Sequence, residues 1–289
     1  MMVRVDRKLL GDQAADVFLP RLPTLPELVP CRGARCTALF CSDVCRAEAF
    51  DTYHAALCPG DDARRAALVA DLYKLSSDTD RTNLLIIARL LASAAQALHS
   101  GRAATADDSL QSLINFSFYS APAPGDMALQ RLLSELICDG FEARAVVTIE
   151  WIQRINGLLL CNASELNPVT SLHLFLAQCE PDERRALLRR AGLPAHLDIV
   201  DIPELKAMCQ HGTGLYAVNN SANHSCKPNA ALASTTVDHT LALISQQELR
   251  AGQEVTIAYC DENLPRSKRR EHLRDMYRFE CRCERCGSS

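Results

Sequence analysis

Three cysteines lie within six residues in the sequence ECRCERC near the end of the chain. Cys281, Cys283 and Cys286 have the spacing of ligands that wrap around one ion, because structural zinc takes four tetrahedral ligands, mostly thiolates at about 2.3 Å. A fourth ligand must come from elsewhere, and Cys226 in ANHSCKPNA (222–230) is the leading candidate. Incidental thiols are the alternative. The spacing favours a zinc site that ties the end of the chain to a distant segment.

A second set of metal-ligating side chains lies in the compact segment 31–58. They are Cys31, Cys36, Cys41, Cys45, His54 and Cys58. Cysteines crowded together in a reducing compartment favour metal binding over disulfides.

Composition narrows the class of protein. The chain has 289 residues, with 48% hydrophobic and 23% charged side chains, as in an ordinary soluble globular protein. The net charge of −4 gives no general attraction to nucleic acid or to an anionic membrane. The start of the chain lacks the apolar run of a secretory signal, and the most apolar stretch, 84–98, is too short to cross a bilayer. We expect a cytoplasmic or nuclear protein, in which fourteen cysteines favour metal binding over disulfides.

The elements that position these ligands follow from local patterns. Residues 1–30 are rich in proline and leucine and are interpreted as an extended arm or linker. The segment 59–201 has helical spacing of apolar residues, as in RTNLLIIARLLASAAQALHS (81–100). Short β-branched runs follow, among them GLYAV, ALASTTV, TLALIS and EVTIAYC, and predict antiparallel strands over 202–262. A final helix and the cysteine tail occupy 263–289. The expected class is α+β.

Three segments in this order carry a resemblance: NHSCKPN (223–229), GQEVTIAY (252–259) and YRFECRCERC (277–286). They resemble the catalytic half and the post-SET tail of a SET domain. With the upstream cysteine module and the helical region, the order is similar to that of the SET and MYND domain (SMYD) protein-lysine methyltransferases, and YHAALCPG (53–60) points to their divergent, tail-lacking branch.

The resemblance implies a small all-β SET core containing a pseudoknot, a large α-helical insertion, a truncated MYND-like finger over 31–58 and a post-SET zinc tail. It also implies an S-adenosylmethionine-dependent protein-lysine N-methyltransferase acting on histones or other proteins. A lysine amine has a pKa near ~10.4 in water and must arrive neutral, so an apolar channel that disfavours the ammonium suits this reaction.

By resemblance, the site residues take distinct roles. Tyr259 and Tyr277 would be catalytic, with rings that wall the lysine channel and hydroxyls that orient the amine. Asn223 and His224 would contact the cofactor, largely through backbone groups and the Asn amide, with Tyr259 beside them. Phe279 would stack near the adenine. Asn162, in LLLCNASEL (158–166), resembles an Asn in a cofactor-side loop of the family. Cys226 would join the tail cysteines around one zinc ion.

Two departures from the family pattern keep a second hypothesis open. By resemblance to MYND fingers, Cys31, Cys36, His54 and Cys58 would bind one zinc ion, whereas Cys41 and Cys45 lack the additional Cys-x2-Cys pair that would join them, so a second zinc ion is left open. SET domains of this layout begin with a Gly-x-Gly element, and none precedes Cys31. We therefore also consider a catalytically impaired SET homologue that acts as a zinc-dependent scaffold and binds peptides through the MYND-like module.

A nucleic-acid-binding protein is disfavoured by the acidic net charge. The basic run RSKRR (266–270) is interpreted chiefly as a solvated helix face, with a nuclear signal or an acidic-substrate patch as alternatives.

Overall fold

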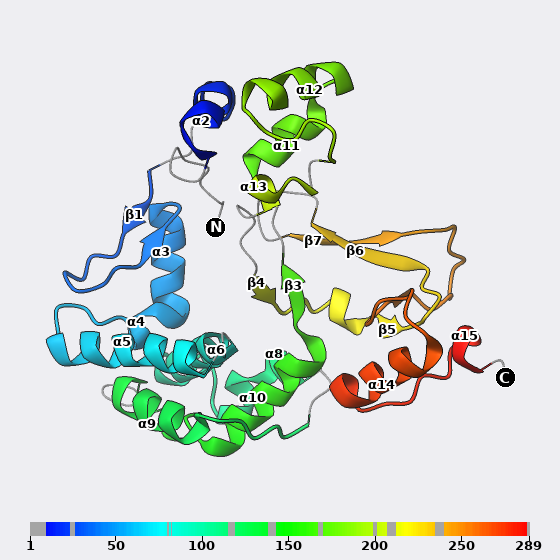
Figure 1. Ribbon diagram of the computed structural model, residues 1–289. Helices are drawn as coiled ribbons and strands as arrows, with labels where there is room; N and C mark the ends of the chain where they lie inside the picture. The colour runs from blue at the N-terminus through cyan, green and yellow to red at the C-terminus, as the bar shows by residue number, and fades with distance from the viewer. Residues whose placement is uncertain are drawn as a thin grey trace. The chain divides into compact units, whose positions relative to one another are not determined.

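The computed structural model describes residues 10–23, 27–79, 81, 83–114, 119–137, 143–166, 170–198, 201–206, 212–234 and 240–287. The chain divides into two compact units. One unit is Pro26–Ala163, here called the finger unit; the other combines Met1–Leu25 with Ser164–Ser289 and, because it contains the three segments that carry the resemblance described above, is called the SET unit. The elements of both units are labelled in Figure 1.

The finger unit begins with a short antiparallel strand pair and continues as a helical bundle (Figure 1). Its strands are β1 (Val29–Pro30) and β2 (Leu39–Phe40). Its helices are α3 (Asp43–Ala49), a π-helical turn (Phe50–His54), α4 (Ala55–Leu57), α5 (Ala63–Asp78), α6 (Asn83–His99), α7 (Ala106–Ser109), α8 (Gln111–Ile114), α9 (Asp126–Ile137) and α10 (Ile149–Asn162).

The helices of this unit form where apolar residues recur at helical spacing, so the prediction for this part of the chain is confirmed in α5, α6 and α9. The most apolar of them, α6, buries Leu84 and Leu91 completely. Helix α10 begins later than its apolar pattern suggests, because Thr148 caps it: its Oγ1 accepts a hydrogen bond from the Trp151 backbone N–H at 3.2 Å. Residues 143–148 form turns instead.

The SET unit combines short strand pairs with helices (Figure 1). Its strands are β3 (Ser164–Leu166), β4 (Gly212–Gly214), β5 (Asn223–His224), β6 (Ala230–Ser234), β7 (Leu241–Ser245) and β8 (Thr256–Ile257). Its helices are α2 (Asp12–Phe18), a 3₁₀ turn (Leu19–Arg21), α11 (Ser171–Gln178), α12 (Pro181–Arg190), α13 (Pro203–Lys206), a 3₁₀ turn (Asn219–Ser221), α14 (Arg266–Tyr277) and α15 (Glu284–Gly287).

The N-terminal segment corrects one expectation. Residues 12–18 are not an extended arm but helix α2, which contributes Val17 and the fully buried Phe18 to a core shared with α11 and α12. Gln13 fixes the same contact, because its Nε2 donates to the Arg190 carbonyl at 2.9 Å. The proline-rich stretch that suggested an arm starts only at the end of this helix, where Pro20 lies in the 3₁₀ turn.

The strand prediction is correct in part. The segments around β6 and β7 form the expected antiparallel hairpin, with Ala230 opposite Ser245, and β3 and β4 also pair antiparallel. The pair β5–β8 is parallel, with Asn223 opposite Thr256 and His224 opposite Ile257. The prediction is wrong for GLYAV, where β4 ends at Gly214 and residues 217–221 form turns. Among the described residues, no helix is both long and apolar enough to cross a membrane.

Candidate functional site

The tail cysteines and Cys226 converge in the SET unit. The ligand sulfurs of Cys226, Cys281, Cys283 and Cys286, here called the tail cluster, all lie within 4.8 Å of one another. The Cys226 Sγ lies 3.5 Å from that of Cys286 and 3.9 Å from that of Cys281. Four sulfurs at about 2.3 Å from a tetrahedral zinc ion are separated by about 3.8 Å. The tail cluster therefore has the size that a zinc ion requires.

Electrostatics support the same interpretation. Burial raises the pKa of the Cys281 thiol to about 11, and it raises the pKa of the Cys226 thiol well above its usual range. Neighbouring thiolates would repel one another in so small a volume. A bound divalent cation reverses this preference, because a coordinating thiol is deprotonated outright. The chemistry of this donor set fits zinc.

His224 connects the tail cluster to the segment that follows β8. Its Nδ1 accepts a hydrogen bond from the Tyr259 backbone N–H at 3.0 Å, and its Nε2 lies 3.2 Å from the Cys226 Sγ. Burial lowers the pKa of this imidazole to about 4, so the ring is neutral near pH 7. Because Nδ1 accepts, the single ring proton is on Nε2 and is donated to the Cys226 sulfur.

An aromatic group lies beside this imidazole. It consists of His224, Tyr259, Tyr277 and Phe279. The Tyr259 and Tyr277 ring centroids are 4.7 Å apart, and the His224 ring lies 5.3 Å from Tyr259 and 6.1 Å from Phe279. The Tyr259 hydroxyl donates to the Ala222 carbonyl at 2.7 Å. Tyr259, Tyr277 and Phe279 also pack against the tail cluster, so one compact region contains the predicted aromatic residues and the predicted metal ligands.

Amide side chains fix the backbone on which this site is built. The Asn229 Oδ1 accepts from the Thr256 backbone N–H, and its Nδ2 donates to the Glu254 carbonyl, both at 2.8 Å. The Asn223 Nδ2 donates to the Glu254 carboxylate at 2.7 Å. Asn229 thereby anchors β8, the strand that pairs with β5 and that Tyr259 follows by two residues. Its role was not predicted, although the residue stands within the quoted motif NHSCKPN.

Arg269 is a second residue whose role the sequence did not reveal. It belongs to the basic run 266–270, but its side chain is only 3% exposed, so the interpretation as a solvated face is wrong at this position. Its Nη2 lies 3.7 Å from the Cys286 Sγ, and its Nη1 donates to the Leu264 carbonyl. A guanidinium here offsets thiolate charge. The available signal was spacing: Arg269 precedes the fully buried Leu273 by four residues on one helix face.

Cys260 also lies at this site and was not predicted. Its sulfur, the His224 ring and the Cys226 sulfur lie within 4.8 Å of one another. It directly follows Tyr259, and burial raises the pKa of its thiol.

The finger unit holds the other predicted ligand set. The ligand atoms of Cys31, Cys36, His54 and Cys58, here called the finger cluster, lie within 4.8 Å of one another. The Cys31 and Cys58 sulfurs are 3.6 Å apart, and the His54 Nε2 lies 3.3 Å from the Cys31 sulfur and 3.5 Å from the Cys36 sulfur. Burial lowers the pKa of His54, which favours the neutral ring that a metal ligand requires.

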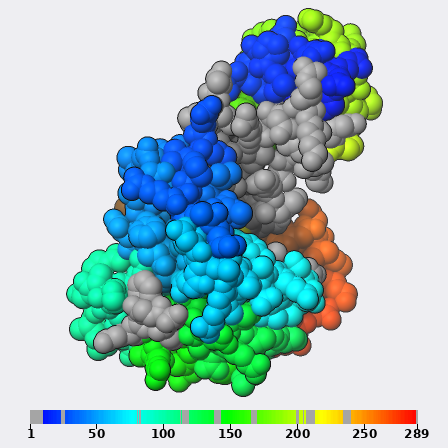
Figure 2. Space-filling view, turned by 90° about the vertical axis from the view of Figure 1, so that its left-hand side faces the viewer, coloured from blue at the N-terminus to red at the C-terminus, as the bar shows by residue number. Residues whose placement is uncertain are grey.

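The helix that carries His54 is held by Gln96 of α6. The Gln96 Oε1 accepts from the Ala56 backbone N–H at 3.0 Å, and its Nε2 donates to the Phe50 carbonyl at 2.9 Å. These two bonds bracket His54 on its π-helical turn. Figure 2 shows the cysteine-rich segment (blue) lying directly on the helices that follow it (cyan). Gln96 is 6% exposed, and sequence patterns did not mark it.

Cys41 and Cys45 lie in the same unit but outside the finger cluster. Their sulfurs are 2.9 Å apart. Asn162 also belongs to this unit, at the end of α10, where its Nδ2 donates to the Leu158 carbonyl at 2.8 Å. Its assignment to a cofactor site stays a prediction.

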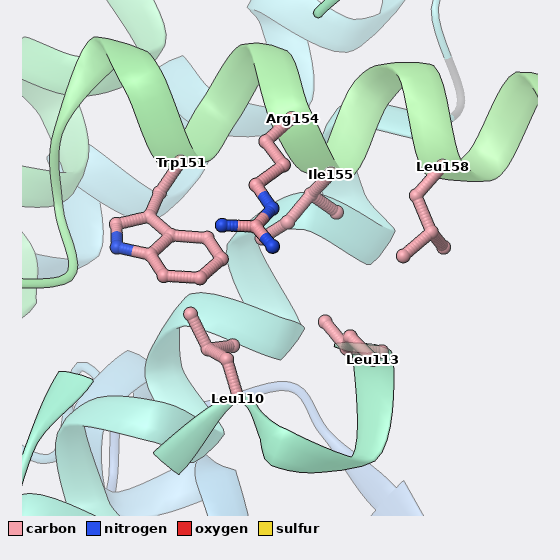
Figure 3. Close-up of a pocket in the computed structure, with 6 residues that line it drawn as sticks. All are labelled: Leu110, Leu113, Trp151, Arg154, Ile155 and Leu158. Atoms are coloured by element: carbon pink, nitrogen blue, oxygen red, sulfur yellow. The ribbon is translucent and has the colours of Figure 1, made fainter. Parts of the chain in front are cut away.

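A small recess in the finger unit contains none of the predicted site residues (Figure 3). Its lining is Leu110, Leu113, Trp151, Arg154, Ile155 and Leu158. The Arg154 guanidinium lies over the Trp151 ring, 4.7 Å from its centroid. The recess is apolar apart from this cation and offers no general base or nucleophile.

Comparison with known proteins agrees with this geometry. The SET domain family matches residues 103–260, more than half of the chain, and the chain therefore belongs to the SET domain family. Protein-lysine N-trimethyltransferase SMYD5 of Gallus gallus is 26% identical over 306 residues, covering 97% of this chain and 71% of the relative. Histone-lysine N-methyltransferase ATXR2 of Arabidopsis thaliana is 26% identical over 303 residues, covering 91% of this chain and 63% of the relative.

A shorter but stronger similarity covers 79 residues. Over them the chain is 42% identical to histone-lysine N-methyltransferase SMYD3 of Mus musculus, which corresponds to 27% of this chain and 18% of the relative. Together these relatives place the chain among the SET and MYND domain protein-lysine methyltransferases. The prediction of family is confirmed.

Proposed function

We propose that this protein transfers a methyl group from S-adenosylmethionine to a lysine side chain of a protein substrate. One observation carries the proposal: His224, the last residue of β5, belongs to the aromatic group, and Cys226, two residues later, belongs to the tail cluster. The predicted lysine-binding residues and the predicted zinc ligands are thus one local assembly.

Tyr259 and Tyr277 are assigned to the lysine channel. Their closely spaced rings offer apolar walls that disfavour an ammonium, which lowers the cost of presenting a neutral amine. The Tyr259 hydroxyl donates its proton to the Ala222 carbonyl, which orients its oxygen, and that oxygen would accept a hydrogen bond from a lysine N–H. Orientation of the amine by such fixed groups is the main catalytic contribution that we assign to the protein.

The cofactor is assigned to the β5 side of the aromatic group. S-Adenosylmethionine supplies a sulfonium methyl group when it is bound. Both ring nitrogens of His224 already have partners, so His224 would act through its backbone and by positioning Tyr259. The Asn223 amide and the Phe279 ring would provide the polar and stacking contacts. The donor set fits a zwitterionic ligand with an aromatic base.

Zinc in the tail cluster would have a structural role, because four protein ligands close its coordination sphere. It would hold the segment that carries Tyr277 and Phe279 against β5. We assign a second structural zinc ion to the finger cluster. The finger region would bind peptide partners, the substrate would be a histone or another protein, and the protein would act in the cytoplasm or nucleus.

Binding of the cofactor product tests the proposal directly. Isothermal calorimetry of the zinc-loaded full chain with S-adenosylhomocysteine is expected to show one binding site per chain. Transfer of a labelled methyl group from S-adenosylmethionine to a lysine-containing peptide library then tests turnover. A folded, zinc-loaded chain that binds peptides but not S-adenosylhomocysteine would refute the proposal and favour the scaffold hypothesis.

The tyrosine assignment has its own test. Tyr259→Phe is expected to retain product binding while turnover falls by about tenfold or more, because the oxygen that accepts from the amine is lost. Tyr73→Phe is the matched control, since Tyr73 is 58% exposed and lies in the finger unit. Equal turnover of Tyr259→Phe and the wild type would contradict the role of Tyr259.

A further inference from the structure

The sulfurs of Cys41 and Cys45 lie closer together than those of three thiol pairs in the two clusters. They are 2.9 Å apart, whereas the pairs Cys31–Cys58, Cys226–Cys281 and Cys226–Cys286 are separated by 3.5 to 3.9 Å. Two thiolates on one tetrahedral zinc ion require about 3.8 Å. The pair is therefore too close for shared zinc coordination, and among the described residues no third ligand joins it.

The local fold keeps the two sulfurs together. Cys41 directly precedes Ser42, the N-cap of α3, and Cys45 lies in the first turn of that helix. The Ser42 Oγ accepts from the Cys45 backbone N–H at 3.1 Å. This cap fixes the chain direction between the two cysteines. An S–S bond of about 2.05 Å then requires the two sulfurs to approach by about 0.9 Å.

Accessibility distinguishes Cys41 from the other described thiols. Cys41 is exposed, and Cys58, Cys226, Cys281 and Cys286 are buried. The remaining described cysteines are partly exposed: Cys31, Cys36, Cys45, Cys161, Cys179, Cys260 and Cys283. Reaction of a thiol with a dissolved oxidant requires access to its sulfur. Zinc ligation further reduces the reactivity of cluster thiolates. An oxidant therefore meets Cys41 before it meets the clusters.

We propose that Cys41 and Cys45 form a redox-active dithiol that a peroxide converts into an intramolecular disulfide while both zinc clusters stay intact. One thiol of the pair loses its proton, and its thiolate attacks one peroxide oxygen; the O–O bond breaks, a sulfenic acid forms, and the departing hydroxide takes up that proton to become water. The thiolate of the second cysteine then attacks the sulfenic sulfur, forms the S–S bond and expels hydroxide, which takes up the proton released by the second thiol. Two thiols and one hydrogen peroxide yield one disulfide and two water molecules. A dithiol reductant reverses the reaction by thiol–disulfide exchange.

The experiment uses the zinc-loaded full chain treated with one equivalent of hydrogen peroxide, followed by alkylation of free thiols and mass spectrometry. Cleavage after Phe40 and Arg46 leaves both cysteines on the peptide 41–46. We expect this peptide to lose both alkylation sites and the mass of two hydrogen atoms, and dithiothreitol to restore both. Bound zinc, measured in the same sample, is expected to remain unchanged.

Variants make the result specific. Cys41→Ser and Cys45→Ser are each expected to abolish the internal disulfide, whereas Cys161→Ser, which alters a partly exposed cysteine of the same unit, leaves it unchanged. Independent alkylation of Cys41 and Cys45 after peroxide treatment would overturn the proposal. So would the loss of one zinc ion per chain in the Cys41→Ser/Cys45→Ser double variant, because that result would make the pair a metal site.

Discussion

His224→Phe is the sharpest test of the link between metal and aromatic residues. The substitution keeps a ring beside Tyr259 and Phe279 but removes the acceptor for the Tyr259 N–H and the donor to the Cys226 sulfur. A hydrogen bond to a charged group contributes about 1.5–3 kcal/mol. Loss of a residue that hydrogen-bonds to a metal ligand lowers metal affinity by about 10- to 100-fold, which is about 1.4–2.8 kcal/mol. The two free-energy ranges overlap, and we expect the zinc affinity of the tail cluster to decrease by about 10- to 100-fold.

The assay is a competition between the protein and a chromophoric zinc chelator. The finger cluster provides an internal reference, because His224→Phe leaves its ligands unchanged. One zinc ion should therefore leave the variant at a chelator concentration about 10- to 100-fold lower than in the wild type, while the other leaves at the same concentration. His196→Phe, at an exposed histidine of the SET unit, is the matched control.

Two outcomes would refute this reasoning. If His224→Phe released both zinc ions at the wild-type concentrations, the imidazole would not support the Cys226 thiolate. If both ions were lost equally early, the effect would be general unfolding and not a local hydrogen bond. Circular dichroism of the zinc-loaded variant checks that the fold is retained.

Three further predictions concern the supporting structure. Gln96→Leu removes both hydrogen bonds that bracket His54 and leaves buried backbone groups unpaired, so urea denaturation should show a loss of about 2–4 kcal/mol, and zinc affinity of the finger cluster should fall while the tail cluster is unaffected. Burial lowers the pKa of His173 in the folded chain, so below about pH 6.5 the unfolded chain binds more protons than the folded chain, and the free energy of unfolding should decrease as the pH falls. This decrease should be less steep in His173→Gln, which keeps an acceptor for the Thr170 N–H. An equal pH dependence of the variant and the wild type would contradict this. Gly157→Ala would place a Cβ 1.6 Å from the Tyr119 carbonyl oxygen, so its melting temperature should drop markedly for a cost of about 3 kcal/mol or more; an unchanged melting temperature would refute that close approach.

Ligand spacing and apolar periodicity carried most of what the sequence could predict. The tail cluster was identified because three of its members are close in sequence and their type restricts the chemistry. Helices α6 and α9 were identified because their apolar residues repeat at the helical period over many residues. Such signals are local, and each is complete within one segment.

The features that were missed depend on partners distant in the chain. Nothing near Gln96 indicates that its side chain will bond to the helix around His54. Arg269 lies in a run of basic residues, and only the packing of α14 against the thiolates distinguishes it from its neighbours. The parallel pairing of β5 with β8 is equally non-local, because alternation within a strand does not specify the direction of its partner.

The two ligand sets also differ in when they can form as the chain is synthesised. All finger-cluster ligands lie within residues 31–58, so that site requires closure of only a short loop. The tail cluster cannot form until Cys281, Cys283 and Cys286 have been synthesised, about 60 residues after Cys226. The aromatic group likewise forms only after Tyr277 and Phe279 have emerged from the ribosome, later than His224 and Tyr259. Under the proposed function, a nascent chain would fold its finger first and remain unable to methylate until residues 277–286 have emerged and captured zinc. Zinc supply would then determine what fraction of newly made chains matures into working enzyme.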